Sequence, residues 1–308
     1  MLSVTTPAPT RRLTRLEHVT GEIGSADAAT IARLIDHASA AIENYCGGLP
    51  FARELVVESV PGYGGLELGL SRTPITVVDS VLFDSEVVTD YVIGNRDEGM
   101  LYRQAGWSWT DQVALGLAGR QRWPGRGSPL PRGEEPRFAV TYLGGYIVPE
   151  QNREGVATVS VDGADDSFND TAALFPSLLR AGDVVVASGF GVSANNGRFV
   201  VAGVPTASKI PVSAALATES ASVGRTLTFE PPGGCRPFLD VEKACIETVK
   251  AWWFERASNP NVTEKQVGGL RISHGGGPAA PSLRVDYQGL PAICVGLLRP
   301  WIHRGRAA

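Results

Sequence analysis

Lysine, histidine and cysteine are scarce in this chain of 308 residues. Only four lysines stand among its 28 basic residues, so arginine carries most of the positive charge. The formal net charge of −4 gives no case for a strongly basic nucleic-acid-binding protein. The four cysteines are far apart and form no CxxC pair, so we expect reduced thiols and neither a disulfide nor a zinc site.

Long apolar runs are also missing. No stretch approaches the roughly 18 apolar residues that a membrane-spanning helix needs, and the first residues lack the apolar centre of a signal peptide. Apolar residues make up 43% of the chain and charged residues 19%, which is typical of a folded, soluble protein. We therefore expect a protein made in a cytoplasm, without a membrane partner.

Common signatures of catalysis are absent as well. The sequence has no GxxxxGK[ST] phosphate loop, no GxSxG elbow and no HExxH metal motif. The four histidines are expected at the surface, and the acidic run 162–170 lacks the spacing of a calcium-binding loop. We expect no catalytic residues, no cofactor and no metal, although an enzyme of unrecognised type remains an alternative.

Helical spacing is clearest in residues 25–48, where a glycine pair, Gly47 and Gly48, supplies a stop. Before it, residues 1–12 are expected to form a loose arm. The sequence TRLE, residues 14–17, has the form of a capping box and predicts the start of a short first helix.

Strand-like runs rich in Val, Ile, Leu and Tyr fill residues 54–103, which predicts a meander. A Gly/Pro/Arg loop at 117–136 follows, of a length unusual inside a compact domain. Residues 137–150 then return to a strand and a turn. Five more strand-like runs between 156 and 231, with a hairpin signal at Asn196-Gly197, predict a small all-β barrel or sandwich inserted at 151–235.

The helical period resumes in LDVEKACIETVKAWWFERASNP, residues 239–260. Trp252 continues its apolar stripe, whereas Trp253 and Phe254 point about 100 and 200 degrees away from that stripe. One interpretation is a central helix buried on all sides. The other is a subunit interface formed by Trp252, Trp253, Phe254 and Arg256, because such residues are enriched at interface centres. A short apolar helix at 291–298 and a basic tail close the chain.

The order of these segments resembles the head-to-tail connector (adaptor) proteins of long-tailed bacteriophages and gene transfer agents. The resemblance covers about residues 13–150 and 236–303. It is carried by ASAAIENYCGG, GYGGLELGLSRTPITVVDSVLFDSEVVTDYVI, GMLYRQAGW, VTYLGGYIVP, ACIETVKAWWFER, VGGLRISH and LPAICVGLLRPWI. It implies an α+β fold: a mainly helical adaptor core with a β-hairpin or meander portion. The sequence departs from the family pattern at 151–235, where the inserted β module leaves an adaptor core that is discontinuous at 1–150 and 236–308.

The resemblance implies a structural virion protein of the neck, assembled in the host cytoplasm. Such proteins form a homo-oligomeric ring, generally of twelve copies, beneath the portal protein. The ring continues the channel for genome packaging and ejection, joins the next neck or tail protein, and lets DNA pass without specific binding. By analogy, the C-terminal residues Arg299, Trp301, Arg304 and Arg306 are expected to contact the portal.

Two other functions stay open at this point. The chain could be another neck or tail component, such as a tail terminator or head-completion protein, since these also form rings. Alternatively, the β module could make it a binding protein that recognises a carbohydrate or a host surface.

Overall fold

A computed structural model describes residues 2–8, 10–24, 27–48, 50–83, 85–108, 138–233, 235, 238–257, 264–267, 270–273, 285–286 and 290–302. Of these described residues, 34% lie in strands and 25% in helices. The expectation of a mainly helical core is therefore wrong. The residues expected to form a hairpin or meander beside a helical core instead build two sheets that enclose a hydrophobic core of their own.

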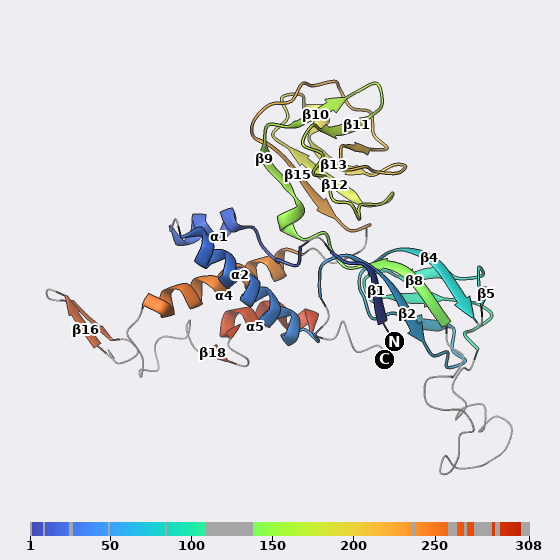
Figure 1. Ribbon diagram of the computed structural model, residues 1–308, viewed down its shortest axis with the longest axis horizontal. Coiled ribbons are helices and arrows are strands. Elements are labelled where there is room, and N and C mark those ends of the chain that lie inside the picture. Colours follow the sequence, from blue (N-terminus) through green and yellow to red (C-terminus); the bar gives the residue numbers. More distant parts are fainter. Residues whose placement is uncertain are drawn as a thin grey trace, which may run out of the picture.

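Three bodies are visible in Figure 1, each with a separate hydrophobic core: a helical body, a host-sheet body and a β module. The helices lie on one side, the host sheets on the other, and the β module stands over the region between them. The chain passes repeatedly between bodies, so residues near both ends contribute to the helical one.

The helical body brings together two N-terminal and two C-terminal helices. They are α1 (Leu16–Ile23), α2 (Ala28–Tyr45), α4 (Leu239–Ala257) and α5 (Ala292–Leu298), the last followed by a 3-10 turn, η3 (Arg299–Trp301). Helix α4 packs against the other three. Its fully buried residues lie three and four positions apart from turn to turn, so they share one face of the helix. They are Val241, Ala244, Cys245, Thr248 and Val249.

Helix α2 confirms the prediction from residues 25–48. The Asp27 side chain caps it by accepting a hydrogen bond from the Thr30 amide, and Gly48, at a φ of 82°, donates back to the Glu43 carbonyl. The capping box predicted at 14–17 is wrong. Arg15 is the N-cap of α1 without a side-chain hydrogen bond, because the Thr14 hydroxyl donates to Glu242 of helix α4.

The host-sheet body contains an antiparallel sheet in the order β1-β2-β8-β4-β5 and a smaller sheet in the order β3-β7-β6. The strands are β1 (Leu2–Thr6), β2 (Glu54–Val60), β3 (Glu67–Gly69), β4 (Ile75–Phe83), β5 (Glu86–Val87), β6 (Val92–Asn95), β7 (Met100–Tyr102) and β8 (Phe138–Gly144). Residues 2–6 were expected in a loose arm but pair with β2 at the edge of the sheet. The long loop predicted at 117–136 lies outside the described residues.

The β module consists of two sheets, β10-β11-β14 and β13-β12-β15-β9. It contains η1 (Pro149–Gln151), β9 (Arg153–Val156), β10 (Val159–Asp162), β11 (Ser167–Asp170), β12 (Val184–Ser188), η2 (Ser193–Asn195), β13 (Gly197–Val200), β14 (Lys209–Pro211) and β15 (Arg225–Glu230). Its core runs from Ile147 to Phe229.

Strands β12 and β13 do form a hairpin, but the tight turn predicted at Asn196-Gly197 is wrong. Asn196 is extended, and its side chain holds the loop by bonding both backbone groups of Phe190.

Two short ladders complete the described structure. Strands β16 (Glu264–Val267) and β17 (Leu270–Ser273) form a hairpin, and β18 (Val285–Asp286) pairs with β19 (Leu290–Pro291). Strand β19 leads directly into α5, which returns the chain to the helical body.

Candidate functional site

The aromatic end of α4 divides between the inside and the outside of the protomer. Trp252 and Trp253 are partly buried and pack against the helical core, whereas Phe254 is 52% exposed. The backbone of Arg256 continues the helix, but its side chain lies outside what the structure describes. Of the predicted interface residues, Phe254 is thus the one described with its ring largely at the surface.

The predicted portal-contact residues are also separated. Arg299 is exposed in η3, while Trp301 is fully buried. The Trp301 ring lies edge-on to Phe51 and Tyr146, at centroid distances of 5.6 and 5.7 Å, and 6.2 Å from Phe238. Arg304 and Arg306 lie outside the described residues. Trp301 therefore anchors the C-terminal turn within its own chain.

A charged cluster that the sequence did not predict joins the β module to the helical body. Helix α1 contributes His18, α4 contributes Glu242 and β9 contributes Glu154. The Nδ1 atom of His18 lies 2.8 Å from Glu242 Oε1, and its Nε2 atom lies 2.8 Å from Glu154 Oε2. Partial burial lowers the pKa of His18, but its hydrogen bonds to the two carboxylates outweigh burial and raise the pKa above its ordinary value.

A second charged contact joins the β module to the host sheet. Arg53, just before β2, places Nη1 at 2.6 Å from Oδ2 of Asp183, and both side chains are almost completely buried. Arg53 also donates to the carbonyls of Gly145 and Leu178, and the Asp183 carboxylate accepts from the Arg180 amide. Because a buried charge needs its partner, this pair fixes the module against the sheet.

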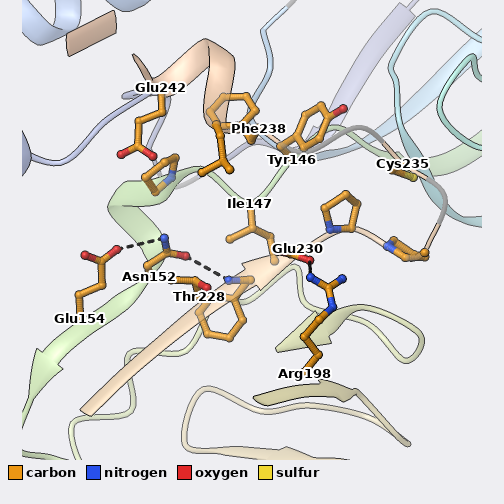
Figure 2. A pocket seen from close by; sticks show the side chains of 16 residues that line it. Tyr146, Ile147, Asn152, Glu154, Arg198, Thr228, Glu230, Cys235, Phe238 and Glu242 are labelled. Carbon is orange, nitrogen blue, oxygen red and sulfur yellow. Dashed lines mark hydrogen bonds and ion pairs between the residues drawn. The ribbon is translucent and has the colours of Figure 1, made fainter. Parts of the chain in front are cut away.

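Glu154 and Glu242 also line a cavity of about 270 Å³, shown in Figure 2. One wall comes from Phe238 and the start of α4, including Glu242, and another from β15 and the prolines after it. Figure 2 shows Asn152 bridging this second wall to Glu154: its amide donates to Glu154 and its carbonyl accepts from the Phe229 amide. The cavity therefore marks the seam along which module and helices meet.

The described residues contain no group of three or more His, Cys, Asp or Glu side chains arranged to hold a metal ion. Three of the four cysteines are buried, and all four are thiols outside any disulfide. Burial raises the pKa of Cys245 to about 12, so this thiol is protonated at neutral pH and is a poor nucleophile. Within the described part of the chain, no helix is long and apolar enough to span a bilayer.

Sequence reasoning missed His18, Arg53 and Asp183. The chain separation explains this: Arg53 and Asp183 are 130 positions apart, and His18 and Glu242 are 224 positions apart. The sequence does place His18 on a predicted short helix. Nothing in the sequence, however, selects Glu154 and Glu242 from the other acidic residues as its partners.

Comparisons with known proteins do not identify a site, since no family model, no curated protein and no solved structure matches this chain.

Proposed function

We propose that this chain is a head-to-tail adaptor, a structural protein of the virion neck. About twelve copies form a ring beneath the portal, by the family resemblance; the ring continues the DNA channel and offers its lower face to the next neck or tail protein. The protein acts by assembly and catalyses no reaction.

The observation that carries the proposal is the exposure of Phe254. Its neighbours Trp252 and Trp253 pack onto the helical core, so the same helix end is anchored on one side and presents an aromatic ring on the other. Aromatic residues are enriched at the centres of protein interfaces. A neighbouring subunit in the oligomer would cover the Phe254 side chain without any rearrangement of α4.

Two further features support the proposal. The helical body is assembled from residues near both ends of the chain, in the order that carries the resemblance. The negative net charge also suits a channel through which DNA must slide, because a basic lining would retain phosphate.

The assembly test compares two substitutions on one helix. Phe254→Asp buries a carboxylate in the proposed interface, so we expect it to weaken ring formation by about 2 kcal/mol or more, roughly 30-fold. Leu239→Asp is the matched control, since Leu239 is 71% exposed at the other end of α4, where an acidic residue suits the helix dipole. Native mass spectrometry and electron microscopy, with and without the portal, report the ring.

Ring formation by Leu239→Asp and its loss in Phe254→Asp would support the proposal. If the wild-type protein forms no symmetric assembly either alone or with its portal, the adaptor function is wrong.

The portal contact needs its own test. Removing the C-terminal residues would also remove buried Leu298 and Trp301, so a truncation would damage the core. Arg299→Glu avoids this because Arg299 is exposed, and Arg33→Glu, on the exposed face of α2, is the control. We expect Arg299→Glu alone to reduce capture by the portal in a pull-down, more strongly at low salt because the contact is electrostatic.

A further inference from the structure

His18 is the meeting point of two bodies. It lies on α1 of the helical body, and its ring is held between Glu242 of the same body and Glu154 of the β module. These three residues are named the His18 clamp. The side chains are neither fully buried nor free in solvent: 33% of His18, 23% of Glu154 and 16% of Glu242 is exposed.

The geometry of the clamp specifies a protonation state. A neutral imidazole has one N–H and one nitrogen lone pair, so it can donate to only one carboxylate. With both ring nitrogens 2.8 Å from carboxylate oxygens, a neutral ring would set a lone pair against a negatively charged oxygen. Only the imidazolium form donates to both sides.

Neighbouring groups reinforce this arrangement. Beside His18, Arg15 donates to the Asn152 carbonyl and lies 4.0 Å from Glu154, while Glu17 pairs with Arg15. The Thr14 hydroxyl donates to Glu242. Across the cavity, Arg198 and Glu230 of the β module form a separate ion pair.

A second attachment of the β module contains no histidine. The Arg53–Asp183 pair is buried, and arginine keeps its charge throughout the range in which histidine titrates. The helical body also holds the module through Arg15, which donates to the Asn152 carbonyl, so the His18 contact is one of several attachments and is the one that depends on a histidine proton.

We propose that protonated His18 clamps the β module onto the helical body, and that the module pivots on the Arg53–Asp183 pair when His18 loses its proton. The raised pKa of His18 sets the direction of the effect. The clamp is complete at pH values below the pKa of His18 in the open form, and it is lost as the pH rises through the pKa of the closed form. This inference concerns the single chain and does not rest on the proposed ring.

The first test measures the proton itself. Nuclear magnetic resonance of the full chain follows the ring nitrogens of His18 through a pH titration, in the wild type and in the double variant Glu154→Gln/Glu242→Gln. We expect His18 to titrate at a higher pH in the wild type, because the variant keeps the shapes but removes both charges. Equal midpoints would overturn the clamp, and this test does not depend on the folding of any His18 variant.

The second test measures the module. Spin labels at Arg33→Cys on α2 and Val204→Cys on the module, both exposed positions, are placed in a Cys235→Ser background that leaves only buried cysteines. As the pH rises from about 6 to about 9, we expect a second population of distances between the spin labels, that of the open form, to grow. Its ratio to the first population should rise by up to about tenfold for each pH unit between the pKa of His18 in the open form and its pKa in the closed form.

The matched variants are His18→Gln and His37→Gln, the latter at an exposed position of α2. His37→Gln should retain the pH-dependent second population, whereas His18→Gln should show it at every pH. An unchanged distance distribution in the wild type from about pH 6 to about pH 9 would refute the proposal.

Discussion

Arg53 and Asp183 are the most sharply testable pair at the scale of single residues. Asp183→Asn keeps the shape but leaves the buried Arg53 charge without its partner, so we expect the free energy of unfolding to fall by about 3–5 kcal/mol. The double variant Arg53→Met/Asp183→Leu removes both charges and should be more stable than Asp183→Asn. Urea unfolding curves of the single and double variants give the comparison.

An exposed ion pair in the same module provides the control. Lys209 and Asp165 lie 2.7 Å apart with 41% and 58% of their side chains exposed, so Asp165→Asn should cost less than about 1 kcal/mol. If Asp183→Asn costs no more than Asp165→Asn, the buried pair does not fix the β module.

Residue-scale sequence reasoning succeeded only where the reason for a residue was local. The cysteines, well separated in the sequence, are thiols outside any disulfide in the structure, and three of the four are buried. The roles of His18 and Trp301 depend instead on partners more than 100 positions away, such as Glu242 and Tyr146. Their local patterns, a histidine on a short helix and a tryptophan after a proline, fit surface positions equally well.

Among the elements, helix α2 has the clearest link from sequence to stability. Because the Asp27 side chain accepts the hydrogen bond of the Thr30 amide, Asp27→Ala should lower the free energy of unfolding by about 1 kcal/mol. Asp27→Ser keeps an acceptor oxygen and should lose much less. Equal losses in the two variants, measured by urea unfolding and followed by circular dichroism, would argue that the cap contributes nothing.

A helix with regular apolar spacing could be predicted from the sequence, whereas the helix caps and the pairing of strands could not. Helix α2 follows from apolar spacing, which depends on the chain alone. The capping box failed because Thr14 bonds to Glu242 of α4 instead. The fold class failed for a related reason: strand-like runs were recognised, but pairing β2 with β8, across 78 or more positions, is a long-range contact that no local pattern specifies.

At the scale of the whole molecule, the β module is a separately packed body held by polar contacts. The core residues of the module lie between Ile147 and Phe229. Among the described residues of that stretch, Val148 alone belongs to the core of another body, the helical one. Arg53–Asp183 and the His18 clamp thus hold the module in a defined orientation without sharing its hydrophobic core.

Removing the whole module should therefore be less harmful than breaking its buried ion pair. In a variant with residues 151–235 replaced by a short Gly/Ser linker, Arg53 loses Asp183 but also loses the residues that cover it, so its charge returns to water at little cost. In Asp183→Asn the same charge stays buried. We expect the deletion variant to be soluble, to keep the helical and host-sheet cores and to unfold cooperatively in urea; an insoluble or molten product would show that these two cores require the module.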